Sequence, residues 1–247
     1  MEKLIVFDFD GTLVDSASQF KEIIKMYYKN NLPNEVCSEE VANNIVKHYG
    51  EYGNFDYKIT LNNKQLSKEE QGKVVFDIME YMGQLRKNNK VSFRFFNGAK
   101  EFLHSLKDSY DLVICSGSAK ESIEYSLQEN NLSPLFKNVV SERSEHINKP
   151  NPELLKRAID STKNNYKQII VVGDTDNDIQ LANNFKKFYT NYNVKTIAVS
   201  YGFFQDKQHL QQFNPDKTVD SLEELKDNLN NLQEVDKLFN KEAEITK

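Results

Sequence analysis

Short apolar runs recur along this sequence, and stretches with helical spacing separate them. The clearest runs are four residues long and almost free of polar side chains, which is typical of strands buried on both faces of a parallel sheet. We predict strands over Leu4–Phe7, Leu112–Cys115, Ile169–Val172 and Thr196–Val199, with a weaker one over Val139–Val140. Strands that alternate with helices predict an open α/β sheet with right-handed crossovers.

The stretches between the runs carry apolar residues on one helical stripe, as Phe102, Leu103 and Leu106 do. Ser221 and Glu224 have the spacing of a capping box, which favours a helix start at that point. The helices predicted around the sheet cover Ala99–Leu106, Ala119–Leu132, Pro152–Ile159, Asp176–Phe185 and Ser221–Leu232.

Residues 17–93 break the alternation, because they show helical patterns and no clear strand. We therefore predict two parts: an α/β core formed by 1–16 with 94–247, and a helical insertion over 17–93 that follows the first strand. We expect the core to carry the chemistry, since the polar motifs that follow apolar strands all lie in it.

The overall composition excludes several classes of protein. A formal net charge of -5 argues against a nucleic-acid backbone as the main partner. No apolar stretch approaches the roughly 18 residues that a membrane span needs. The two cysteines have no metal-site or disulfide spacing, and the N-terminus lacks the long apolar core of a secretory signal. We expect a cytoplasmic protein that binds neither membrane nor nucleic acid.

Two aspartates, Asp8 and Asp10, directly follow the first predicted strand. Ligands of open α/β sheets bind at the carboxyl ends of the strands, and alternation along an extended chain places both side chains on one side. Two carboxylates so close repel each other unless a cation lies between them, and hard oxygen ligands favour Mg²⁺. The alternative is a pair of acidic loop residues that bind nothing.

A second acidic group, Asp174, Asp176 and Asp178, follows the predicted strand over Ile169–Val172. Asp174 and Asp178 are four residues apart and share a face if a helix begins there. With Asp8 and Asp10 they could form one metal site. The alternative is an acidic helix N-terminus that complements the helix dipole, which we favour for Asp176.

Two weaker signals lie between these acidic groups. Ser116 and Gly117 follow the strand over Leu112–Cys115, and such small residues let backbone N–H groups approach a phosphate at a helix start. Lys149 precedes a proline-initiated helix and could neutralise a phosphoryl group. Taken singly, the first is an ordinary strand-to-helix turn and the second a solvated surface charge.

In this order, the four segments resemble the motifs of the haloacid dehalogenase (HAD) superfamily: DFDGTLVDS, SGS, the lysine of KPNP, and GDTDND. The resemblance covers residues 1–16 and 95–200. It implies a doubly wound, Rossmann-like parallel sheet with an inserted α-helical cap. The KPNP segment resembles that of the phosphoglycolate-phosphatase-like branch, and the helical insertion resembles the C1 cap of the family.

The resemblance also implies a reaction, the Mg²⁺-dependent hydrolysis of a phosphate monoester of a small metabolite. Asp8 would attack phosphorus and become an aspartyl phosphate. Asp10 would protonate the leaving oxygen and then activate water. The cation would be held by Asp8, the backbone carbonyl of Asp10, and Asp174, with Asp178 supporting the site.

The transferring phosphoryl group, according to the same resemblance, would be bound by Ser116, the Gly117 N–H and Lys149. Thr12 is counted with these phosphate-binding residues, because it would orient the first loop. A phosphomutase, which returns the phosphoryl group to a sugar, is an alternative enzyme. A phosphate-binding module without turnover is the alternative outside the enzymes.

The segment over 47–58 contains two glycines, several aromatic residues and two lysines, and it interrupts the helical patterns of the insertion. Glycine permits backbone angles that other residues avoid. We hypothesise that this segment is a loop that closes over the active site and contacts the non-phosphate part of the substrate. A plain helix–helix connection is the alternative.

Overall fold

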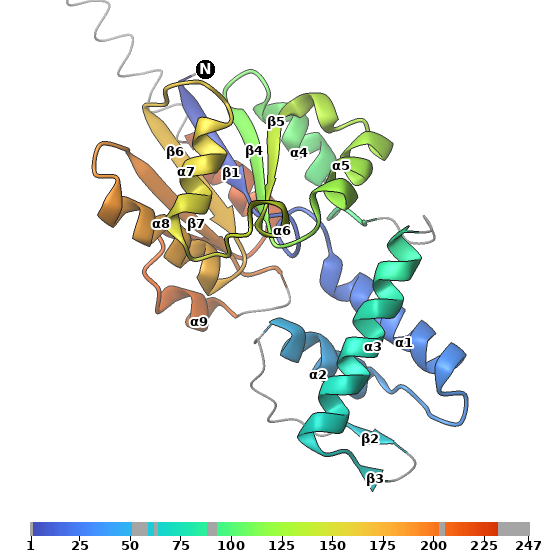
Figure 1. Cartoon of the computed structure of the whole chain (residues 1–247). Helices are drawn as coiled ribbons and strands as arrows, with labels where there is room; N and C mark the ends of the chain where they lie inside the picture. Colours follow the sequence, from blue (N-terminus) through green and yellow to red (C-terminus); the bar gives the residue numbers. More distant parts are fainter. Residues whose placement is uncertain (1, 51–58, 62–63, 88–92, 203–205, 232–247) are drawn as a thin grey trace, which may run out of the picture. The chain divides into compact units, whose positions relative to one another are not determined.

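The computed structural model describes residues 2–50, 59–61, 64–87, 93–202 and 206–231 (Figure 1). The chain forms two compact units, 1–13 with 95–247 and 14–94. The division predicted from the sequence, at 16/17 and 93/94, lies close to these boundaries. Among the helices in the described ranges, none is long and apolar enough to cross a membrane.

The larger unit contains a six-stranded sheet in which every neighbouring pair is parallel. Its strands are β1 (Lys3–Phe7), β4 (Asp111–Ser116), β5 (Phe136–Ser141), β6 (Gln168–Gly173), β7 (Val194–Val199) and β8 (Lys217–Val219). All five predicted strands are confirmed. The edge strand β8 was missed, because three residues with one buried apolar side chain carry no clear pattern.

The helices of this unit are α4 (Ala99–Leu106), α5 (Lys120–Glu129), α6 (Glu142–Glu145), α7 (Pro152–Asp160), α8 (Asp176–Phe188) and α9 (Lys207–Gln211). A further helix spans 222–231, and the hydroxyl of Ser221 accepts the Glu224 N–H at its start, at 3.1 Å. The prediction over Ala119–Leu132 was too long. Asn131 takes a φ of 56°, and the chain enters a 3₁₀ turn over Ser133–Leu135.

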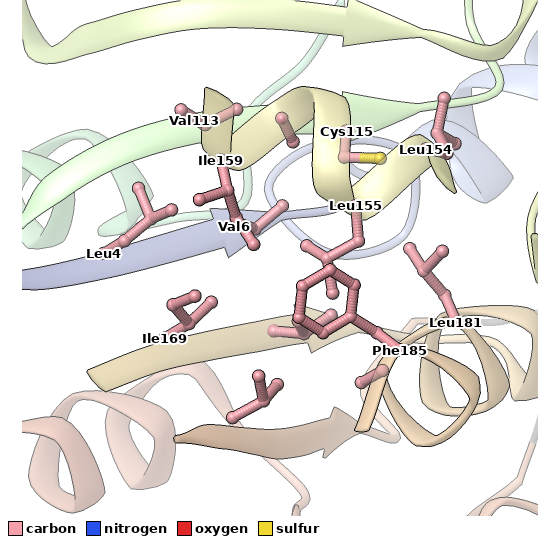
Figure 2. Close-up of a cluster of buried hydrophobic side chains, with 14 of the residues drawn as sticks. Leu4, Val6, Val113, Cys115, Leu154, Leu155, Ile159, Ile169, Leu181 and Phe185 are labelled. Atoms are coloured by element: carbon pink, nitrogen blue, oxygen red, sulfur yellow. The ribbon is translucent and has the colours of Figure 1, made fainter. Parts of the chain in front are cut away.

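Helices α7 and α8 cover one face of the sheet (Figure 2). Phe185 of α8 packs there among apolar side chains from the strands and from α7, which include Leu4, Val6, Val113, Cys115, Leu155, Ile159 and Ile169. On the other face, Phe7 meets the ring of Phe102 on α4 edge-on, with centroids 6.2 Å apart. Both faces are buried, so the predicted doubly wound α/β fold is confirmed.

The smaller unit contains α1 (Ser16–Asn31), α2 (Glu39–Gly50), α3 (Lys68–Lys87), and a short antiparallel pair, β2 (Thr60–Leu61) and β3 (Lys64–Gln65). No strand was predicted here, because two residues are too few to show alternation. Asn30 Nδ2 donates to Tyr81 Oη at 2.8 Å and thereby joins α1 to α3. Of the segment predicted as a loop over 47–58, the first four residues belong to α2, and 51–58 lie outside the described residues.

The strand order, β5-β4-β1-β6-β7-β8, places β1 at the point where the chain changes direction. From β1 the chain builds β4 and β5 on one side, and it then crosses over to build β6, β7 and β8 on the other. Ligands of such sheets bind outside the carboxyl ends of the strands at this switch point. A ligand-binding site is therefore expected at the carboxyl ends of β4, β1 and β6.

Candidate active site

Asp8 and Asp174 lie side by side at the carboxyl ends of two paired strands. Asp8 follows β1, and its N–H donates to Val172 O of β6 at 2.8 Å, which extends the ladder by one residue. Asp174 directly follows β6. Both side chains are buried, with 8% of Asp8 and none of Asp174 exposed. Parallel pairing thus brings together two acidic residues that lie far apart in the sequence.

Lys149, in the loop between α6 and α7, forms a buried ion-pair bridge. Its Nζ donates to Asp8 Oδ1 at 2.6 Å and to Asp178 Oδ1 at 2.7 Å. An ammonium has three protons, so these two bonds leave one for a ligand. The side chain is only 6% exposed, which rules out a solvated surface charge.

Asp178 connects this bridge to the start of α8. Its Oδ2 accepts from the backbone N–H of Thr175 at 3.1 Å and from the hydroxyl of Thr175 at 2.7 Å. Because Lys149 donates to Oδ1, both carboxylate oxygens have hydrogen-bond donors. Asp178 therefore fixes Lys149 relative to the helix.

Asp174 has far fewer donors. Thr12 Oγ1 donates to its Oδ1 across 3.4 Å, and no protein group in the described ranges hydrogen bonds to its buried Oδ2. Two glycines border this carboxylate. A Cβ on Gly202 would lie 2.6 Å from Asp174 Oδ2 and equally close to Gly11 O, and a Cβ on Gly11 would overlap the carboxylate itself. The backbone therefore approaches Asp174 at positions where only glycine fits.

Carboxylate oxygens of Asp8, Asp174 and Asp178 lie within 4.8 Å of one another, a spacing that suits a shared metal ion. Burial, opposed by Lys149 and reinforced by Asp178 and Asp10, raises the pKa of Asp8 to about 8. Burial and the charges of Asp8 and Asp178 raise the pKa of Asp174 well above its ordinary value. A deficit of positive charge and a buried oxygen without a donor fit a hard divalent cation.

The turn after β4 lies at the same edge of the sheet. Ser116 is the buried last residue of the strand, and its Oγ accepts the Ser118 N–H at 3.2 Å. Its own hydroxyl proton is therefore available to a ligand. Gly117 follows and is exposed, and as a glycine it has no side chain to shield its backbone N–H. This arrangement suits an anion between the turn and Lys149.

Asp10 and Thr12 continue the loop after β1. Asp10 is half-buried, and its Oδ2 accepts from Ser118 Oγ at 2.6 Å. Tyr201 Oη donates to Thr12 O at 2.9 Å. Sequence reasoning did not assign roles to Ser118 and Tyr201, although Tyr201 follows β7 and the strand-end rule could have found it. Asp176 instead accepts from Gln180 Nε2 within α8, at 3.1 Å.

Comparison with known proteins gives matches along most of the chain. The profile of the haloacid dehalogenase-like hydrolase family matches residues 5–199. Pyrophosphatase PpaX of Bacillus cereus is 26% identical over 234 residues, which cover 92% of this chain and 96% of that protein.

Solved structures with the same fold include a Clostridium difficile protein assigned as a phosphatase, with a TM-score of 0.65 and 19% identity over 92% of this chain and 98% of that one. The Bacillus subtilis hydrolase YfnB, solved with magnesium bound, has a TM-score of 0.63 and 14% identity over 93% of this chain and 99% of that one. At these identities, the likeness shows the fold alone.

Proposed function

Because this chain belongs to the haloacid dehalogenase-like hydrolases, we propose that it is a phosphatase that cleaves a small phosphate monoester through an aspartyl phosphate on Asp8. The observation that carries the proposal is the buried position of Lys149 between the carboxylates of Asp8 and Asp178. An ammonium there holds the nucleophile and keeps one proton for a phosphoryl oxygen.

In the first half of the proposed reaction, a carboxylate oxygen of Asp8 attacks phosphorus, and the bond from phosphorus to the ester oxygen breaks. Asp10 gives its proton to the departing oxygen, so the product leaves as an alcohol. The phosphoryl oxygens are held by the Ser116 hydroxyl, the Gly117 N–H and Lys149. The transition state of phosphoryl transfer needs mainly correct positioning of the reactants and neutralisation of the charge on the phosphoryl oxygens.

In the second half, water attacks the phosphorus of the aspartyl phosphate. Asp10, now ionised, takes a proton from this water. The bond from phosphorus to the Asp8 oxygen breaks, which frees inorganic phosphate and restores the carboxylate. Asp10 ends protonated, as it began, so the two halves balance.

We propose Mg²⁺ as the cation, held by Asp8, Asp174 and the backbone carbonyl of Asp10, with Asp178 in support. The clustered carboxylates support this assignment, and so does Asp174 Oδ2, which accepts no hydrogen bond from the described residues. The magnesium bound by YfnB supports it as well. When bound, the ion would neutralise charge on the phosphoryl group and on the carboxylates.

The first test is the hydrolysis of p-nitrophenyl phosphate. We expect turnover that chelation with EDTA removes and added Mg²⁺ restores. Asp8→Asn should lower kcat by at least about 10³-fold, because an amide does not serve as the nucleophile. Asp160→Asn, the same change on the exposed end of α7, is the matched control and should retain activity. Near-normal turnover by folded Asp8→Asn would refute the covalent mechanism.

A substrate panel then separates the remaining candidates. It should include inorganic pyrophosphate, because the Bacillus cereus relative is named a pyrophosphatase, together with phosphoglycolate and sugar phosphates. Release of inorganic phosphate in step with substrate loss supports a hydrolase, whereas an isomerised sugar phosphate indicates a mutase. Binding without either product indicates a module that lacks turnover. We propose that the helical insertion over 17–93 is the cap that selects among these substrates.

A further inference from the structure

The hydroxyl of Ser118 donates to Asp10 Oδ2 at 2.6 Å and so links the loops that follow β4 and β1. We propose that Ser118 is a positioning residue that aims the acid–base carboxyl of Asp10 at the leaving-group oxygen. This inference rests on the proposed phosphatase function, since it assigns to Ser118 a role in the proton transfer of that reaction.

Ser118 is held at both of its peptide groups. Its N–H donates to Ser116 Oγ at 3.2 Å, and its carbonyl accepts from Ser141 Oγ at 2.7 Å. Ser141 is itself fully buried, and its Oγ also accepts the Arg143 N–H at the start of α6. The backbone of Ser118 is therefore fixed by two neighbouring elements, which gives its side chain a rigid base.

A carboxyl group has two oxygens, and this contact distinguishes them. Because Oδ2 of Asp10 accepts from Ser118, Oδ1 is the oxygen left to exchange a proton with the substrate. In the first half-reaction the O–H bond at Oδ1 breaks and its proton goes to the leaving oxygen as the ester P–O bond breaks. The proton of Ser118 stays on Oγ throughout. Proton transfer requires this alignment, because the donor must lie within hydrogen-bond reach of the leaving oxygen.

The same geometry predicts which substrates depend on Ser118. An alkoxide leaving group needs a proton as the P–O bond breaks, whereas p-nitrophenolate leaves readily without one. Ser118→Ala removes only the hydroxyl and retains the two backbone bonds that join the turn to Ser116 and Ser141. This substitution should therefore slow the hydrolysis of substrates with poor leaving groups the most.

The experiment compares kcat/KM for benzyl phosphate and p-nitrophenyl phosphate, which are similar in size. This ratio reports the steps up to the departure of the alcohol, so it excludes the hydrolysis of the aspartyl phosphate that both substrates share. General acid catalysis contributes about 10²–10⁴-fold, so we expect Ser118→Ala to lower the benzyl rate relative to the nitrophenyl rate by about tenfold or more. Ser118→Thr keeps a hydroxyl and should restore the ratio. Ser126→Ala, which removes another buried serine hydroxyl from α5, should leave both rates unchanged.

A double-mutant cycle provides the second measurement. In an Asp10→Asn background, Ser118→Ala should lower the benzyl rate no further, because the group that it positions is already gone. Equal losses of kcat/KM for both substrates in folded Ser118→Ala, or additive losses in the cycle, would overturn the positioning role and leave the phosphatase assignment intact. A wild-type protein that hydrolyses neither ester would instead overturn the proposed function, and this inference with it.

Discussion

Two buried aspartates lie at opposite ends of the sheet, and their surroundings differ in kind. Asp111 opens β4 at the amino edge and is 3% exposed, and Asp174 follows β6 at the carboxyl edge and is fully buried. Asp111 Oδ2 accepts from Tyr166 Oη and Asn164 Nδ2, each at 2.9 Å, and Lys137 Nζ lies 3.4 Å from Oδ1. Among the described residues, Asp174 accepts one long bond, from Thr12, and two other carboxylates lie nearby.

The pKa values of these two residues move in opposite directions. Burial alone would raise that of Asp111, but the bonds from Tyr166 and Asn164 and the charge of Lys137 hold it below its ordinary 3.8. Burial and the charges of Asp8 and Asp178 raise the pKa of Asp174. A buried acid with donors stabilises the fold, whereas one without them indicates a place where a ligand supplies the missing charge.

The largest effect is expected from Asp174→Asn, which tests whether Asp174, unlike Asp111, holds a cation. If Asp174 holds the cation, the variant should need at least about tenfold more Mg²⁺ for half-maximal activity. Without metal, it should melt no lower than the wild type, because the change removes an unfavourable buried charge. A Mg²⁺ titration and a thermal melt with EDTA measure both effects. An unchanged titration curve would show that Asp174 is not a ligand.

A second test compares two glycines that both adopt left-handed backbone angles, Gly11 at a φ of 73° and Gly98 at 82°. A Cβ on Gly98 would come no closer than 4.0 Å to Leu222, whereas one on Gly11 would overlap Asp174. Gly98→Ala should cost only the backbone penalty, about 1–2 kcal/mol in unfolding free energy. Gly11→Ala should cost more than this.

The two glycine variants should also differ in catalytic activity. Gly11→Ala should also lower kcat by at least about tenfold, because a small displacement at a site costs much of the rate, while Gly98→Ala should not. Chemical denaturation and steady-state kinetics check both variants. Equal losses of stability and equal activities would contradict the close packing at Asp174.

The smallest expected effect is at the amino edge. Asp111→Asn should lower the unfolding free energy by about 1–3 kcal/mol at neutral pH, since hydrogen bonds to a charged group are weakened. Activity should be unchanged. Because the folded pKa of Asp111 is depressed, its contribution is present above 3.8 and is lost as pH falls through the lowered value. Denaturation of both proteins from pH 7 down through this lowered pKa should therefore show their stabilities converging, and a gap that persists below it would refute this account.

The sequence was sufficient for five of the six strands of the sheet and for the edge at which the candidate site lies. Apolar runs such as Leu4–Phe7 and Ile169–Val172 predict strands buried on both faces, because a parallel sheet covered by helices requires continuous apolar side chains. A polar residue at the end of such a strand lies at the carboxyl edge, so the positions of Asp8, Asp174 and Ser116 along the chain already predict that they meet there.

The tertiary structure decided the contacts among those residues. Lys149 reaches Asp8 across 141 positions in the sequence, and Ser118 reaches Asp10 across 108. No local periodicity encodes such pairs, since they depend on the order of the strands and on the packing of loops at the sheet edge. Sequence alone therefore indicated which acidic residues gather at the edge. Only the packed structure decided that Asp178 has donors on both oxygens while Asp174 Oδ2 has none within the described part of the chain, because hydrogen bonding depends on distances that folding sets.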